Sequence, residues 1–129
     1  MLYDNSLNRQ LTIPNRQNLF NHYKQLKFSY NLGAILLDVR TIQEFNRSHL
    51  PNARHIAFDQ LSNLLTLIKE WNLPIITYSE YGNRSSVATQ LLQSASIKAV
   101  DGGARKTLET LLFNRKNKEQ LRDHIIPPY

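Results

Sequence analysis

The sequence has 129 residues and contains no cysteine. Without a thiol, the chain cannot form a disulfide, a thiolate metal site or a thiolate nucleophile. It also has no apolar run near the roughly 18 residues that a transmembrane helix needs. Residues 1–10 are polar and lack the apolar centre of a secretory signal. These absences predict a cytoplasmic protein without a membrane segment.

What the chain does contain fits a folded domain. Hydrophobic residues make up 41% of it and charged residues 20%, as in ordinary globular proteins. The formal net charge of +6 would attract anions. The basic residues are scattered, however, and their densest group, Arg115, Lys116 and Lys118, fits a solvated helix. We therefore expect no nucleic-acid partner.

Apolar runs alternate with helical patterns along the chain. Buried strands are predicted at residues 34–39, 55–57, 74–79 and 97–100. Helices are predicted to begin near residues 15, 40, 59, 84 and 104. This alternation favours an α/β fold, with a parallel sheet of about five strands and helices on both faces. In these helices Ile42, Phe45 and Val87 are expected to face inward.

The segment PIITYSEYGNRSS, residues 74–86, combines three local signals. An apolar run is followed by a polar turn with Gly82 and Asn83, which tolerate unusual backbone angles, and then by a helical pattern. A strand, a tight loop and a helix N-terminus in that order form a nest of N–H groups that attracts an anion. Ser79 opens this loop, where a nucleophile would lie. Residues 38–40 and 101–103 also follow strands, so we expect them nearby.

Three motifs in this order resemble those of the rhodanese-like (thiosulfate sulfurtransferase) domains in their small single-domain form. LDVRTIQEF (37–45) with SHLPNA (48–53) is similar to that family's D-V-R-x-x-x-E-[FY] segment and G-H-[IL]-P-G-A turn. YSEYGNRS (78–85) is similar to the active-site loop Y-C-x-x-G-x-R-[SA], and DGG (101–103) to a glycine pair after the last core strand. The resemblance implies one rhodanese-like three-layer domain over 1–129, with a core at about 14–112, an N-terminal arm at 1–13 and a helical tail at 113–129.

In active members of the family, a cysteine at the first loop position takes a sulfane sulfur from a donor such as thiosulfate. This chain has Ser79 there. A hydroxyl cannot form a persulfide, because that chemistry needs a polarisable sulfur that attacks sulfur and leaves again. The resemblance therefore implies a domain that is inactive as an enzyme and needs no cofactor.

Three hypotheses for the function remain open. The favoured one is a non-catalytic domain that binds a partner protein or a small oxyanion. The binding loop would consist of Ser79, Glu80, Tyr81, Gly82, Asn83, Arg84 and Ser85. The alternative is a thiosulfate or persulfide sulfurtransferase whose cysteine is replaced by serine in this sequence. The loop also diverges from active members at Glu80 and Tyr81, two middle positions that vary within the family, and a change at one position would not explain that.

The third hypothesis is a serine-dependent hydrolase or phosphatase. A serine nucleophile needs a positioned base, and no histidine has a place in the Ser79 motif. The loop also has four residues between Ser79 and Arg84, one fewer than the related dual-specificity phosphatases carry. The ordinary role of the Ser79 hydroxyl would be a hydrogen bond to loop amides or to a bound anion.

Two other residues of the loop, Arg84 and Tyr81, each have two possible roles. Arg84 would either grip an oxyanion or pair with a carboxylate, whereas Glu80 would oppose an anion. Tyr81 would contact a partner or lie in solvent. No histidine, aspartate and glutamate cluster has metal-ligand spacing.

The remaining motif residues are expected to be structural. Asp38 should cap the following turn, and Arg40 with Glu44 should tie down the end of the strand. The resemblance also implies structural roles for His49, Gly102 and Gly103.

Overall fold

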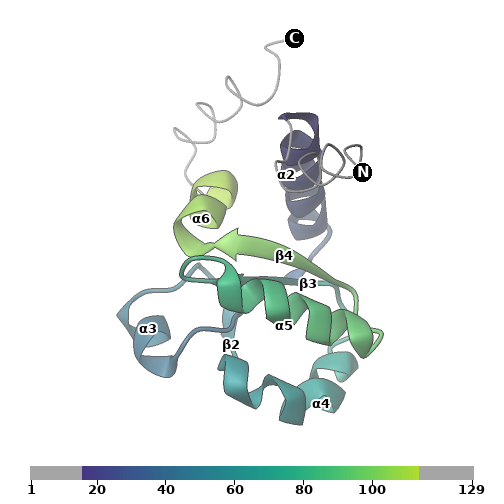
Figure 1. The fold of residues 1–129 in the computed structure, drawn as a ribbon, viewed down its shortest axis with the longest axis vertical. Coiled ribbons are helices and arrows are strands. Elements are labelled where there is room, and N and C mark those ends of the chain that lie inside the picture. The colour runs from purple at the N-terminus through teal and green to yellow at the C-terminus, as the bar shows by residue number, and fades with distance from the viewer. Residues whose placement is uncertain (1–15, 114–129) are drawn as a thin grey trace, which may run out of the picture.

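The computed structural model describes residues 16–113 (Figure 1). Its strands form one parallel sheet in the order β2-β1-β3-β4. The strands are β1 (Ile35–Asp38), β2 (Arg54–His55), β3 (Ile75–Ser79) and β4 (Ala99–Ala104). The predicted α/β class and parallel sheet are confirmed, with four strands in the described part rather than about five. The arm at 1–13 and all of the tail at 113–129 except Phe113 lie outside the described residues.

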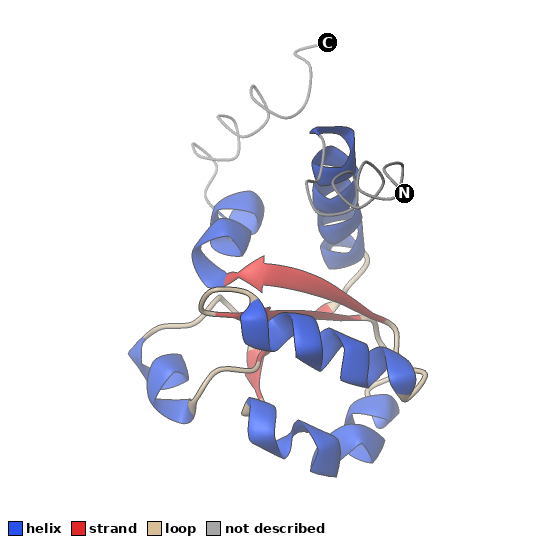
Figure 2. Cartoon of the chain, viewed as in Figure 1, coloured by secondary structure: helices blue, strands red, loops and turns tan. Residues whose placement is uncertain are grey.

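Helices cover both faces of this sheet, which gives three layers (Figure 2). One face carries α2 (Arg16–Asn31) and α6 (Arg105–Phe113). The other carries the 3-10 helix η1 (Phe58–Leu64), α4 (Leu65–Glu70) and α5 (Asn83–Ser94). The short helix α3 (Ile42–Arg47) lies beyond the carboxyl end of β1. Within residues 16–113 no helix is long and apolar enough to cross a membrane.

Alternation along β1 and β3 divides the core into two clusters, because successive strand residues point to opposite faces. Ile75 belongs to the α4–α5 cluster and Ile76 to the α2–α6 cluster. The buried members of the α4–α5 cluster are Ile35, Leu37, Val39, Ile56, Leu61, Ile68, Ile75, Ala88, Leu92, Ile97 and Ala99. Those of the α2–α6 cluster are Leu26, Ala34, Leu36, Leu50, Ile76, Tyr78, Leu108, Leu111 and Leu112.

Several local predictions need correction. Ile42 is 46% exposed and Val87 is 51% exposed, so the prediction that they face inward is wrong. The buried residues of α5 are Ser85, Ala88, Thr89 and Leu92, which rotates its inner face away from Val87. The helix predicted from Asp59 begins as the 3-10 helix η1 before it becomes α4. The last strand runs through the Asp101–Gly103 motif instead of ending before it.

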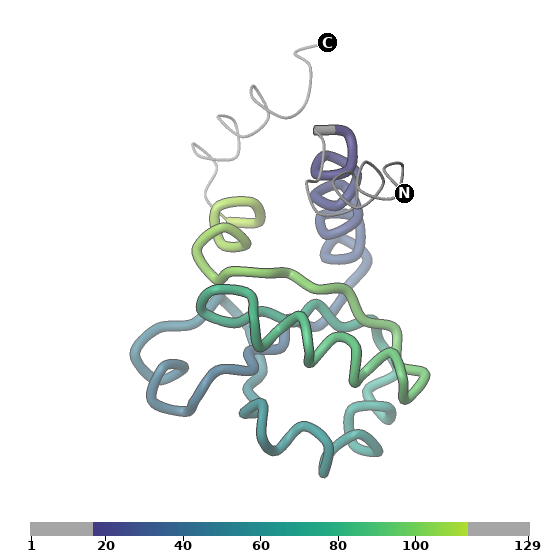
Figure 3. The backbone as a smooth tube through the Cα atoms, viewed as in Figure 1, coloured from purple at the N-terminus to yellow at the C-terminus, as the bar shows by residue number. Residues whose placement is uncertain are grey.

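The carboxyl ends of the strands bring distant segments together. The loop after β3 lies beside the junction of β4 and α6 (Figure 3). A Cβ atom on Gly82 would be 3.6 Å from backbone atoms of Gly103 and Ala104. The Arg40 side chain, after β1, also donates a hydrogen bond to Glu80 at 2.9 Å, so the three segments at residues 38–40, 79–85 and 101–103 are neighbours, as the sequence predicted.

Candidate functional site

Ser79 ends β3 and is fully buried. Its Oγ accepts hydrogen bonds from the backbone N–H of Gly82 (3.1 Å) and of Ser85 (3.0 Å). Gly82 has a φ of +95°, a left-handed conformation that favours glycine, and it precedes the first residue of α5. The loop therefore wraps around the Ser79 oxygen, and the predicted hydrogen bonding of this hydroxyl to loop amides is confirmed.

A second layer of hydroxyl groups supports the loop from inside the protein. Thr77 and Thr89 share a hydrogen bond of 2.7 Å, and Thr89 donates to the Ser85 carbonyl at 2.8 Å. The Ser85 hydroxyl donates to the Gly82 carbonyl at 3.1 Å. Every buried polar side-chain atom in the described residues has a partner. The loop conformation is thus fixed by a satisfied buried network.

Three strand ends are joined by a chain of charges. The Arg40 guanidinium is 2% exposed and donates to both carboxylate oxygens of Asp38, and to Glu80 at 2.9 Å. Arg105, at the start of α6, donates to Glu80 at 3.1 Å. Burial alone would lower the pKa of Arg40, but the hydrogen bonds and charge of Asp38 raise it. Hydrogen bonds from Arg105 and Arg40 lower the pKa of Glu80.

A separate ion pair holds α3 against α5. Arg84 donates to the two carboxylate oxygens of Glu44 at 2.8 and 3.1 Å. Glu44 also accepts from the Thr41 N–H, and its own N–H donates to the Thr41 hydroxyl, which is a capping box at the start of α3. Arg40 and Glu44, both expected to tie down the end of the strand, therefore act in separate ion pairs: Arg40 binds Asp38 and Glu80, and Glu44 binds Arg84.

The charges around the loop are balanced. Three guanidinium groups, those of Arg40, Arg84 and Arg105, bind three carboxylates, those of Asp38, Glu44 and Glu80. Of the two roles open to Arg84, this geometry shows the pairing with a carboxylate. Glu80 does place a negative charge beside the loop as expected, but two arginines neutralise it. An oxyanion that bound here would have to compete with these carboxylates for the guanidinium N–H donors.

The other predicted residues lie around this centre. Asp38 accepts from the Arg40 N–H, as expected for a cap of the turn after β1. His49 Nδ1 lies 2.9 Å from the Phe45 carbonyl and its ring stacks on Phe45. Within residues 16–113 no hydrogen bond joins Ser79 to a histidine, so the geometry gives no support to a serine nucleophile. Tyr81, at the outer part of the loop, is 82% exposed.

Close packing explains the glycine pair. A Cβ on Gly102 would lie 2.5 Å from the Thr77 carbonyl oxygen, so only glycine fits there. Gly103 has a φ of +79°, and its N–H donates to Asp101 at 2.8 Å. These contacts support the structural role implied for both residues.

Tyr78 and Arg105 belong to the site but were not singled out as site residues. The buried Tyr78 hydroxyl accepts from the Leu50 N–H at 3.1 Å, and burial raises the pKa of this tyrosine well above its usual value. Arg105 follows the glycine pair at the carboxyl end of β4, and that position was the signal that could have revealed it. In the described part of the chain, no three His, Cys, Asp or Glu residues are grouped as metal ligands.

Known proteins with similar sequences carry the same fold. The model of the rhodanese-like domain family matches residues 20–109. Thiosulfate sulfurtransferase GlpE of Pseudomonas savastanoi pv. phaseolicola (strain 1448A / Race 6) is 28% identical over 74 residues, which are 55% of this chain and 69% of that protein.

Two solved structures agree with this result. SSP1007 of Staphylococcus saprophyticus subsp. saprophyticus has a TM-score of 0.53 at 25% identity, covering 58% of this chain and 75% of that one. The human single-domain sulfurtransferase TSTD1 has a TM-score of 0.54 at 25% identity, covering 67% of this chain and 91% of that one. The chain belongs to the rhodanese-like domain family.

Proposed function

We propose that this chain is a non-catalytic rhodanese-like domain that recognises a partner protein through the loop of residues 79–85. The observation that carries the proposal is the Ser79 hydroxyl at the centre of the loop, held by the Gly82 and Ser85 amides. In sulfur transfer from thiosulfate, a thiolate bonds to the outer sulfur while sulfite leaves, and cyanide then removes that sulfur as thiocyanate. Ser79 offers an oxygen instead, and the chain has no cysteine elsewhere.

The charge balance favours a protein partner over a small anion. Ser79 is buried, and the three arginines around the loop are bound to carboxylates. Tyr81 instead projects into solvent at the outer part of the loop, and tyrosine is enriched in protein interfaces. These features suit contact with a protein surface more than the gripping of a free oxyanion.

A small oxyanion is the second candidate, because one observation favours it. Asn83 and Arg84 form the first turn of α5, where backbone N–H groups have no acceptor within the helix. The positive end of the helix dipole lies at the same place. The two candidates are separated by titrating the labelled protein with thiosulfate. Saturable shifts of the amides of residues 79–86 at about 1 mM thiosulfate would favour the anion.

The absence of catalysis is tested by a thiosulfate:cyanide sulfurtransferase assay. We expect no thiocyanate from the protein as it stands. Ser79→Cys is compared with it, and Ser86→Cys, which places a thiol on an exposed residue of the same helix, is the matched control. Activity in Ser79→Cys alone would show that the loop lacks only its nucleophile. Turnover by the unmodified protein would overturn the proposal.

Partner recognition is tested with Tyr81→Ala. We expect a protein retained from the organism's own extract by the unmodified domain to be lost with this variant. Phe28→Ala is the control, because Phe28 is an exposed aromatic residue on α2, away from the loop. Equal retention by Tyr81→Ala and the unmodified domain would contradict recognition through Tyr81.

A further inference from the structure

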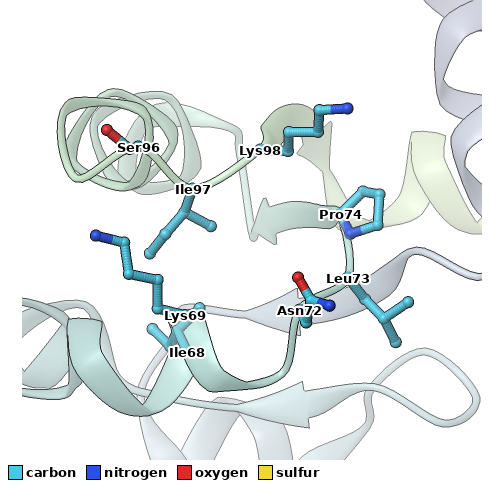
Figure 4. Close-up of a pocket in the computed structure, with 8 residues that line it drawn as sticks. All are labelled: Ile68, Lys69, Asn72, Leu73, Pro74, Ser96, Ile97 and Lys98. Atoms are coloured by element: carbon cyan, nitrogen blue, oxygen red, sulfur yellow. The ribbon is translucent and has the colours of Figure 1, made fainter.

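A cavity of about 350 Å³ lies at the end of the sheet where the parallel strands β3 and β4 begin (Figure 4). It is lined by Ile68, Lys69, Asn72, Leu73, Pro74, Ser96, Ile97 and Lys98. Ser79 is at the opposite end of β3 from Ile75, about 13 Å away at the usual rise per strand residue. The cavity is therefore separate from the Ser79 loop.

The cavity has an apolar floor that belongs to the core. Ile68 at the end of α4 and Ile97 after α5 are both buried members of the α4–α5 cluster. Figure 4 shows Ile97 extending from the end of α5 toward Ile68 and Lys69. Pro74 adds a further apolar surface. An apolar body that entered the cavity would be removed from water, which is favourable.

The charged residues of the lining are both cationic. Lys69 and Lys98 come from two different segments, and none of the lining residues is acidic. Across residues 16–113, every ion pair between a basic side chain and a carboxylate uses an arginine. Within these described residues neither Lys69 nor Lys98 forms an ion pair with a carboxylate, although Lys69 lies in the last turn of α4, where the helix dipole favours a cation. In Figure 4 the two side chains point away from each other, with the Lys69 amino group on the left, below Ser96, and the Lys98 amino group above Pro74.

Backbone hydrogen bonds fix the walls. The Ile75 N–H donates to the Lys98 carbonyl at 2.9 Å, and the Asn72 N–H donates to the Lys69 carbonyl at 3.1 Å. Asn72 and Ser96 hold φ values of +52° and +64°, a region that disfavours residues with a Cβ atom. The backbone of the site is therefore preformed, so a ligand would have to order only side chains such as the exposed Lys69 and Lys98.

We propose that this cavity binds a small carboxylate with an apolar body, such as an aromatic acid. Its volume is in the range of small-molecule sites and exceeds that of a bare inorganic anion. Phosphate sites are built from helix N-termini and arginine forks, and the lining of this cavity contains no arginine. An apolar floor with ammonium groups at its edge matches a hydrocarbon body that carries one carboxylate.

The probe is benzoate, titrated into the ¹⁵N-labelled full chain, with neutral benzamide as the ligand control. We expect saturable shifts of the Asn72, Ser96 and Lys98 amides at millimolar benzoate, about 1 to 10 mM, and none for residues 79–86. Benzamide should bind at least about threefold more weakly, as expected for loss of a partly exposed charge contact.

Lys69→Gln and Lys98→Gln test the cations. Both lysines are exposed, so the variants should fold, and at least one of them should weaken benzoate binding about threefold. Lys106→Gln, on the exposed side of α6, is the matched control and should leave the affinity unchanged. Equal binding of benzamide and benzoate, an equal loss in Lys106→Gln, or no saturation would each overturn the proposal. The loop amides report on the proposed function separately.

Discussion

A methyl group on Gly102 would lie 2.5 Å from the Thr77 carbonyl oxygen and 2.9 Å from Ile76 Cγ2 and Leu108 Cδ2. We expect Gly102→Ala to lower the free energy of unfolding by about 3 kcal/mol, because the crowding involves backbone as well as side chains. Gly103→Ala meets no atom within 4 Å, so it should cost only the left-handed backbone conformation, about 1 kcal/mol. Urea denaturation of the two variants checks the order, and an equal loss would contradict the packing argument.

The sequence predicted where single residues lie in the fold better than it predicted which ion pairs they form. Ser79 and Gly82 lie in the expected loop, because an apolar run followed by a glycine turn fixes where a strand stops. The partner of Arg40 could not be found in the same way. Glu80 is 40 residues away from it in the sequence, and only the pairing of β1 with β3 brings the two together. Ion-pair partners depend on that tertiary approach.

The short helix α3 depends on Glu44 for two contacts. This carboxylate closes the capping box with Thr41 and binds Arg84 of α5. Hydrogen bonds from Arg84, and then from Thr41, together with the charge of Arg84, lower the pKa of Glu44 from its ordinary value of 4.5 to about 2. One side chain therefore both begins α3 and fastens it to α5, beside the Ser79 loop.

This arrangement predicts a pH dependence. A carboxyl group whose pKa is lowered by folding stabilises the folded state above its unfolded-state pKa, and this stabilisation is lost as the pH falls through the folded-state pKa. We expect the Glu44 contribution, about 1 kcal/mol for a partly exposed pair, to disappear between about pH 4.5 and pH 2. Urea titrations across this range should show a shallower pH dependence for Glu44→Gln.

The control for this measurement is Glu70→Gln, which removes an exposed carboxylate of α4. It should keep the pH dependence of the unmodified protein. If Glu44→Gln also kept it in full, the Arg84 pair would not stabilise the fold.

At the scale of elements, strands were easier to predict than helix faces. The continuous apolar runs at β1 and β3 have one explanation, burial on both sides. In α5 the buried face includes Ser85 and Thr89, whose hydroxyls serve the network under the loop. The apolar pattern therefore placed Val87 on the buried face wrongly. Ser85 and Thr89 are polar, and a pattern of apolar residues alone assigns such residues to the exposed face.

The two core clusters share β1 and β3, and this sets how the whole molecule unfolds. Trp71 packs against the α4–α5 cluster, whereas Leu26 lies in the α2–α6 cluster. We expect Leu26→Ala to lower the free energy of unfolding by about 3 kcal/mol. Although Leu26 is on the other face of the sheet, the transition followed by Trp71 fluorescence should shift as far as that followed by circular dichroism.

Leu32→Ala, which truncates an exposed residue just after α2, is the control and should leave the midpoint almost unchanged. Independent unfolding of the two faces would leave the Trp71 transition in place in Leu26→Ala, and that result would contradict a shared sheet as the unit of stability.

The hydroxyl at the centre of the Ser79 loop has a consequence for the thermodynamics of recognition. Ordering a loop costs conformational entropy, about 1 to 2 kcal/mol per residue. Here the Gly82 and Ser85 amides are ordered by an oxygen of the chain itself, so that cost is met during folding. For the partner proposed above, the loop would already have its shape, so less of the binding free energy from contacts around Tyr81 would be lost to ordering it.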